Sequence, residues 1–308
     1  MRKPRALKPG DRVAVVAPAS GFDRRQFDAG LDELRRLGFE PVHDPDVFAQ
    51  HGGYLAGLAA VRAAALVRAW IDPSIAAIVA VRGGYGSVQV LPLLDPAVFA
   101  GPPKAFVGYS DTTSILTWLT QTCQVVSFHG PMLEGRLAEG ESRYDRTTFA
   151  RCLCRAEPIG EIAHPSLEVL RTGEAAGPLT GGTLTQLTAS LGTPFAFDPP
   201  PGAILFLEDV AERPYRIDRM LTQLRLAGIL GRASALVFGE MPQCDEPAGA
   251  PLVQDVIREL VSDFQGPVLF GLPSGHTGGP TLTLPFGVTA RVQAYAVPRV
   301  IVEESAVL

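Results

Sequence analysis

The stretch AFVGYSDTTSILTWL, residues 105–119, indicates how this chain folds. Its apolar start, residues 105–107, is typical of a short buried strand, and the apolar residues from Ile115 onward predict a helix over 111–122. Residues 108–112 (GYSDT) lie between the two and predict a tight turn with Ser110 at the carboxyl edge of the strand. A strand, a turn and a helix in direct succession indicate an α/β fold with a parallel sheet.

Strand and helix patterns alternate on both sides of this stretch. In the first half, strands are expected at residues 12–17, 39–43, 76–81 and 125–128, and helices at 22–37, 55–70 and 144–155. Farther on, Pro, Gly and Thr become frequent, and short apolar runs predict strands at 167–170, 203–208, 235–238 and 288–292, with clear helices only at 217–226 and 251–262. We therefore expect two domains, an α/β domain over 1–160 and a strand-rich domain over 161–308.

The composition excludes several classes of protein. A formal charge of -5 leaves no basic field that could neutralise a nucleic-acid backbone, so a small-molecule partner is expected. The longest apolar runs, such as 75–81, have strand length and are far shorter than the roughly 18 residues of a membrane span. The apolar run 13–17 is too short for a signal peptide, which predicts a cytoplasmic protein. Four cysteines without a C-x-x-C pair predict reduced thiols and no metal site.

Ser110 is the candidate nucleophile. A strand–turn–helix elbow exposes one side chain and directs the N–H groups at the helix start toward it, where a developing oxyanion would be stabilised. The alternative is that Ser110 or Asp111 only caps the following helix, since both residue types are favoured there. The motif also differs from G-x-S-x-G, because Thr112 stands where the second glycine would be.

A second turn, GGYGS at residues 83–87, follows another expected strand. Its backbone should lie at the same carboxyl edge, where open parallel sheets bind ligands. The glycines match neither a dinucleotide fingerprint nor a phosphate loop, because G-x-G-x-x-G is incomplete and no G-K-[ST] follows. Either the bare backbone approaches a substrate or the segment is an ordinary tight turn.

Two histidines could serve as the base that a serine nucleophile needs. His129 follows an expected strand in SFHGP, residues 127–131, and is equally consistent with a core histidine. His276 lies in GLPSGHTGG, residues 271–279, a loop shaped by glycines and Pro273. The sequence pattern leaves both open.

Glu208 is the best candidate for the carboxylate that orients the base. It ends the apolar strand expected over 203–207, and the polar run 213–220 that follows could line a cleft. The alternative is a charge that is simply solvated at the end of a strand.

Short motifs along nearly the whole chain resemble those of the LD-carboxypeptidase family, which includes muramoyl-tetrapeptide carboxypeptidases and microcin C self-immunity hydrolases. In chain order they are VAVVAPAS (13–20), RGGYG (82–86), GYSD (108–111), HGPM (129–132), GG (181–182), LED (207–209) and GH (275–276). The resemblance implies a flavodoxin-like parallel-sheet domain followed by a smaller β-rich domain, usually in a dimer, with the active site at the domain junction.

The resemblance also implies the chemistry. It places a Ser–His–Glu triad on Ser110, His276 and Glu208 and an oxyanion hole on the backbone N–H groups of Asp111 and Gly84, with no metal or organic cofactor. The implied substrate is a cytoplasmic muropeptide whose terminal D-alanine is released across an L-to-D bond.

Two other functions remain open from the sequence. One is an amidase that clears a peptidyl-nucleotide antibiotic, and the other is a non-catalytic two-lobe protein that holds an anion at helix starts. The chain departs from the family at Thr183, where Asn is common, and in residues 57–62, which are more apolar than usual. The Thr183 departure bears on substrate contacts more than on the chemistry.

Overall fold

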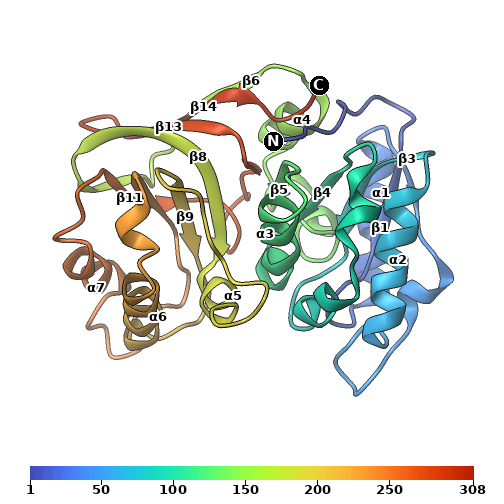
Figure 1. The fold of residues 1–308 in the computed structure, drawn as a ribbon, viewed down its shortest axis with the longest axis horizontal. Helices are drawn as coiled ribbons and strands as arrows, with labels where there is room; N and C mark the ends of the chain where they lie inside the picture. Colours follow the sequence, from blue (N-terminus) through green and yellow to red (C-terminus); the bar gives the residue numbers. More distant parts are fainter.

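A computed structural model describes all 308 residues, which form two sheets with helices packed around them (Figure 1). The first sheet has the strand order β12-β5-β4-β3-β1-β2. Its strands are β1 (Arg12–Val16), β2 (Glu40–Val42), β3 (Ile75–Ala80), β4 (Ala105–Gly108), β5 (Ser127–His129) and β12 (Leu284–Phe286). Strands β1 to β5 are parallel in the order 2-1-3-4-5, which is the flavodoxin-like order, so the expected fold class is confirmed.

Helices connect the parallel strands of this sheet: α1 (Arg24–Arg36), α2 (Ala59–Ile71), α3 (Thr113–Gln121) and, after β5, α4 (Arg146–Cys154). Helix α1 begins where the Asp23 side chain accepts hydrogen bonds from the N–H groups of Arg25 and Gln26, and it ends just before Gly38. Every residue of α3 up to Thr120 is buried, because this helix packs against both its own sheet and the second half of the chain. Figure 1 shows α3 between the two halves.

The second sheet is mixed, with the strand order β6-β14-β13-β8-β9-β10-β11-β7. Its strands are β6 (Pro158–Ile162), β7 (Glu168–Arg171), β8 (Gly173–Thr183), β9 (Ile204–Glu208), β10 (Ala235–Gly239), β11 (Val268–Leu272), β13 (Thr289–Ala294) and β14 (Arg299–Ser305). Strands β8 to β11 are parallel, and the other pairs are antiparallel. Helices α5 (Leu184–Ala189), α6 (Pro214–Leu226) and α7 (Val253–Leu260) also belong to this half.

Strand β12 links the two halves. It comes from the second half of the chain but pairs antiparallel with β5, with Leu284 opposite His129. The two chain ends also meet, since the N–H of Ala6 donates to the carbonyl of Leu308 at 2.7 Å. Because a late strand completes the first sheet, the division at residues 160 and 161 stays a prediction.

The sequence pattern did not predict several elements of the fold. Strand β8, GEAAGPLTGGT, carries four glycines and a proline, which are rare inside strands, and β12 is three residues long with Pro285 at its centre. The six-residue helix α5 is too short for a helical period to be visible. No helix of the structure combines the length and the apolar character that a bilayer span requires.

Candidate active site

Ser110 lies at a sharp turn between strand and helix. Strand β4 ends at Gly108, Tyr109 is extended, and Ser110 has a φ of 61°, in the left-handed region. That conformation costs a non-glycine residue roughly 1–2 kcal/mol, so the surrounding packing must impose it. Thr112 fixes the turn, since its hydroxyl donates to the Tyr109 carbonyl at 2.8 Å.

The glycine turn after β3 lies directly against this elbow. A Cβ added at Gly83 would lie 2.8 Å from the Ser110 Cβ and 3.1 Å from the Asp111 nitrogen, so only glycine fits there. The N–H groups of Asp111 and Gly84 donate to no acceptor within the protein. The Asp111 N–H, which follows Ser110, and the Gly84 N–H, which follows the Gly83 Cα packed on Ser110, are therefore left available for an oxygen of a bound molecule.

Two buried side chains hold the glycine turn in place. Asp111 accepts the Ser87 N–H at 2.8 Å, and the Ser87 hydroxyl donates to the Asp111 carbonyl at 2.5 Å. From the other side, Arg62 of α2 donates to the carbonyls of Gly86 at 2.7 Å and Pro18 at 2.6 Å. Burial lowers the pKa of Arg62 and raises that of Asp111. In the sequence, Arg62 is one of two arginines in the alanine-rich helix α2, and no motif singled it out.

Glu208 and His276 form a buried pair. Glu208 ends β9 with no exposed surface, and its Oε2 accepts both the His276 Nδ1–H at 2.8 Å and the His276 backbone N–H at 2.9 Å. The Thr183 hydroxyl donates to the other carboxylate oxygen, Oε1, so this residue contacts the Glu208–His276 pair, which the expectation of mainly substrate contacts had missed. Because an ionised carboxylate only accepts, His276 carries its proton on Nδ1 and leaves Nε2 free to accept one.

The electrostatics of this pair favour the charged forms. Burial raises the pKa of the Glu208 carboxyl, but the charge and hydrogen bond of His276 outweigh burial and lower that pKa to about 2. Burial lowers the pKa of His276, and the Glu208 charge outweighs it, so that the pKa lies above its ordinary value. The carboxylate is therefore placed to stabilise an imidazolium at His276.

The pair faces the Ser110 elbow across the Tyr109 ring. The Tyr109 and His276 rings are packed edge to face, with centroids 5.0 Å apart and an interplanar angle of 70°. Ser110 and His276 share no hydrogen bond, although Tyr109 immediately precedes Ser110. Such catalytic hydrogen bonds are often long without substrate and tighten in the complex.

Other carboxylates support the same region. Asp209, next to Glu208, accepts hydrogen bonds from the N–H and the hydroxyl of Thr185 and so fixes the start of α5. Burial and the Glu208 charge raise the pKa of Asp209 to about 6. Glu240, after β10, accepts hydrogen bonds from Thr277 and Gly278 in the His276 loop. The sequence did not point to Glu240, and Asp209 entered only as the last residue of the LED motif, without a role.

His129, the other candidate base, is fully buried at the end of β5. Its ring packs on the rings of Tyr109, Phe206 and Phe286, and neither ring nitrogen has a hydrogen-bond partner. Burial lowers the pKa of His129 to about 4, so the ring is neutral near pH 7. Its buried nitrogens are not placed to exchange a proton with a substrate, which leaves His276 as the candidate base.

The neutral state of His129 predicts a loss of stability in acid. Its pKa is about 4 in the folded protein against an ordinary value of 6.5, so between these pH values the unfolded chain binds a proton that the folded chain does not. Lowering the pH from 7 to 4 should therefore remove about 3 kcal/mol of unfolding free energy through this residue. Urea unfolding at pH 7, 5.5 and 4 should show a flatter pH dependence in His129→Leu, and parallel curves for the two proteins would contradict this.

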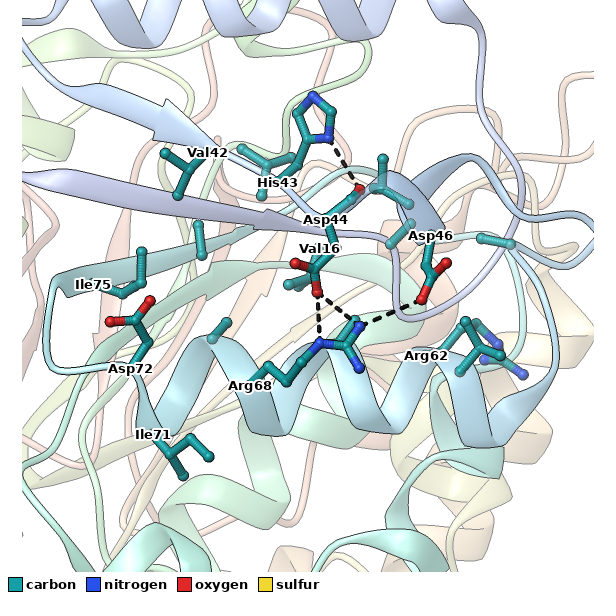
Figure 2. Close-up of a pocket in the computed structure, with 18 of the residues that line it drawn as sticks. Val16, Val42, His43, Asp44, Asp46, Arg62, Arg68, Ile71, Asp72 and Ile75 are labelled. Carbon is teal, nitrogen blue, oxygen red and sulfur yellow. Dashed lines mark hydrogen bonds and ion pairs between the residues drawn. The ribbon is translucent and has the colours of Figure 1, made fainter.

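A separate cavity lies away from Ser110, Glu208 and His276 and is lined in part by Arg62. It has a volume of about 360 Å³ and lies between α2, β1 and the segment after β2. Figure 2 shows Arg68 of α2 pointing to Asp44 and Asp46, with ion-pair distances of 2.7 and 3.6 Å. A smaller cavity of about 100 Å³ adjoins the elbow and is lined from both halves of the chain, by Tyr85 and Gln186 among others.

Comparisons with known proteins agree with this architecture. Residues 13–130 match the model of the LD-carboxypeptidase N-terminal domain, and residues 176–292 match that of the C-terminal domain. The chain is 32% identical over 288 residues to the murein tetrapeptide carboxypeptidase of Pseudomonas aeruginosa, covering 91% of this chain and 92% of that protein.

Solved structures show the same fold. The muramoyltetrapeptide carboxypeptidase of Oxalobacter formigenes superimposes with a TM-score of 0.83 at 29% identity, over 96% of this chain and 99% of that one. The microcin C7 self-immunity protein MccF bound to aspartyl sulfamoyl adenosine superimposes with a TM-score of 0.91 at 24% identity, over the whole of both chains. Taken with the two family models, these similarities show that the chain belongs to the LD-carboxypeptidase family.

Proposed function

We propose that the protein is a serine LD-carboxypeptidase that releases terminal D-alanine from muropeptide tetrapeptides. The observation that carries the proposal is the arrangement of a strained serine elbow, two free N–H groups beside it, and an imidazole oriented by a buried carboxylate. These are the three parts that acyl transfer to a serine needs.

In the first half of the reaction, His276 Nε2 takes the proton of the Ser110 hydroxyl while Ser110 Oγ attacks the carbonyl carbon before the D-alanine. The N–H groups of Asp111 and Gly84 donate to the oxyanion that forms, and the Glu208 carboxylate stabilises the imidazolium. Collapse of the intermediate breaks the C–N bond, and His276 returns the proton to the amine of the leaving D-alanine. The tripeptide part stays on Ser110 as an ester.

Water completes the cycle on the same base. His276 removes a proton from water as the hydroxide oxygen attacks the ester carbonyl, and the imidazolium then protonates the departing Ser110 oxygen. The shortened peptide leaves with a free carboxylate, and each residue returns to its starting state. Every proton transfer passes through His276, so its orientation by Glu208 acts in both halves.

Relatives support the choice of a murein peptide as substrate, since a carboxypeptidase named for murein tetrapeptides is 32% identical over 91% of this chain. The test is mass-spectrometric analysis of purified muramoyl tetrapeptide after incubation with the protein. Release of one D-alanine is expected, while the isomer ending in L-alanine should stay intact. Cleavage of both isomers at equal rates, or of neither, would contradict the proposal.

A second candidate is an amidase acting on peptidyl nucleotides. The chain is 28% identical over 312 residues to the microcin C7 self-immunity protein of Escherichia coli. Two exposed aromatic rings beside the glycine turn, Tyr54 and Tyr85, have centroids 6.3 Å apart and offer surfaces on which a base could stack. Titration with adenosine monophosphate and incubation with aspartyl sulfamoyl adenosine separate the two candidates, because only the amidase should bind the first and cleave the second.

A non-catalytic binding protein would turn over neither kind of substrate, so any Ser110-dependent hydrolysis excludes it. The homodimer and the cytoplasmic location implied by the family resemblance stay predictions, which sedimentation velocity and cell fractionation would test.

Thr183 offers a graded test of the Glu208 carboxylate. Thr183→Val removes the hydroxyl that donates to Glu208 Oε1 and leaves that buried oxygen without a partner. We expect kcat/KM to fall roughly 10-fold to 100-fold, which corresponds to the free energy that a hydrogen bond to a charged group contributes. Thr183→Ser keeps the hydroxyl and is the matched control, expected within about threefold of the native chain. Equal activity of the Val and Ser variants would show that this hydrogen bond does not act on the base.

A further inference from the structure

Arg136 is a buried arginine that contacts both sides of the site. It lies in the segment between the two matched family regions, residues 131–175, and its residue surface is 5% exposed. No carboxylate pairs with its guanidinium, which instead donates only to uncharged oxygens. A charge buried in this way is costly and indicates a specific task.

All five N–H donors of the Arg136 guanidinium have acceptors. Nη2 donates to the carbonyls of Gly275 at 2.9 Å and Thr277 at 3.1 Å, the residues on either side of His276. Nη1 donates to the carbonyl of Gly279 at 3.1 Å, in the same loop, and to that of Arg143 at 3.2 Å. A guanidinium has five donors in a fixed planar fork, so this arrangement uses its full capacity.

The fifth bond reaches the nucleophile elbow. Nε donates to the Tyr109 hydroxyl at 3.2 Å, and the Tyr109 ring packs edge to face on His276. Tyr109 also directly precedes Ser110. One rigid group therefore fixes the backbone on both sides of the base and the residue next to the nucleophile.

We propose that Arg136 is a positioning residue that holds the His276 loop against the Ser110 elbow, so that the base and the nucleophile approach each other only while Arg136 bridges them. The inference rests on the proposed function, because it assigns a role in the same proton transfer. Lysine cannot replace Arg136, since an ammonium has three donors and no planar fork.

The guanidinium charge also acts on the base. The titratable and charged groups around the His276 ring and its loop are Glu208 at the end of β9, Asp209 after it, His129 on β5, Tyr109 after β4, Glu240 after β10, and Arg136. Among them, Arg136 is the cation that lowers the pKa of His276, against the larger effect of Glu208. Removing this charge should raise the pKa of His276, whereas losing hydrogen bonds alone should not.

The test compares Arg136→Met and Arg136→Lys with the native chain, using muramoyl tetrapeptide and active sites counted with a serine-reactive fluorophosphonate. We expect kcat per active site to fall roughly 100-fold in both variants with little change in KM, because a displacement of about 1 Å can cost that much. The acid limb of the kcat/KM profile should move to higher pH in Arg136→Met but not in Arg136→Lys. Arg143→Met is the matched control: it loses one exposed hydrogen bond to the Gly278 carbonyl and an exposed ion pair with Glu139, affects no hydrogen bond to Tyr109 or to the residues flanking His276, and should stay within about threefold.

The proposal would be overturned if Arg136→Met kept the native kcat per active site and the acid limb of its kcat/KM profile stayed at the native pH. If Arg136→Met does not fold, Tyr109→Phe tests the proposal instead, since it removes only the hydrogen bond from Arg136 Nε to the Tyr109 hydroxyl and keeps the ring packed on His276. A kcat reduced about fivefold would support the bridge, and an unchanged kcat would contradict it. If the native chain turns over no muropeptide, the proposed function fails, and NMR titration of His276 still shows whether Arg136→Met raises its pKa.

Discussion

Ser110→Ala is expected to abolish the release of D-alanine while leaving the fold intact. Removal of a serine nucleophile in a triad typically costs 10⁴-fold or more, because the remaining groups cannot form the covalent intermediate. The Ser110 hydroxyl makes no hydrogen bond within the protein, so its loss leaves no buried group without a partner. The φ of 61° is unfavourable for alanine and serine alike, so the variant should unfold at the same urea concentration.

The measurement is the rate of D-alanine release at saturating muramoyl tetrapeptide, together with urea unfolding of each protein. Ser142→Ala is the control, since its hydroxyl lies on the surface and bonds only the Glu139 carbonyl. If Ser110→Ala kept more than a hundredth of the native rate, a covalent mechanism at this serine would be wrong.

Glu208→Gln should have the second largest effect, a loss of about 10⁴-fold in kcat, as found when a triad carboxylate becomes an amide. The glutamine amide can donate to His276 Nδ1, which moves the ring proton to Nε2 and blocks the transfer from Ser110. Glu208 Oε2 also accepts the His276 backbone N–H, so the amide must disturb this loop as well. We expect an additional loss of about 1–3 kcal/mol in the free energy of unfolding.

Glu240→Gln provides a matched comparison. Glu240 holds the same loop through Thr277 and Gly278 but makes no contact with the imidazole. Its replacement should lower kcat less than about tenfold, so the ratio between the two variants separates orientation of the ring from support of the loop. Equal losses in both variants would show that Glu208 acts only through the loop backbone.

The fold was largely predictable because its first half follows simple periodicities. The elbow around Ser110 could be read locally, since a buried strand, a turn and a helix follow one another within fifteen residues. Strand β8 could not be predicted from the sequence, because its glycines allow close contacts that exist only in the folded protein. A Cβ added at Gly181, for example, would lie 1.9 Å from the Phe206 carbonyl oxygen. Strand β12 is three residues long and finds its partner about 155 positions earlier, and no local pattern encodes such pairing.

The candidate site was predictable only in part. Family resemblance pointed to the pair His276 and Glu208, whereas spacing alone left His129 equally open. The structure separates the two histidines by their surroundings, since one bonds a carboxylate and the other is enclosed by aromatic rings. Arg62 and Arg136 could not be identified, because each acts through backbone carbonyls from distant segments and carries no motif of its own.

The most direct test of the Ser110 mechanism is intact-protein mass spectrometry after acid quenching within the first turnover of muramoyl tetrapeptide. Covalent catalysis at Ser110 predicts a transient mass increase equal to the muramoyl-tripeptide acyl group, located by digestion on the peptide containing Ser110 and missing in Ser110→Ala. Turnover of the substrate with no adduct at any quenching time, combined with full activity of Ser110→Ala, would contradict it.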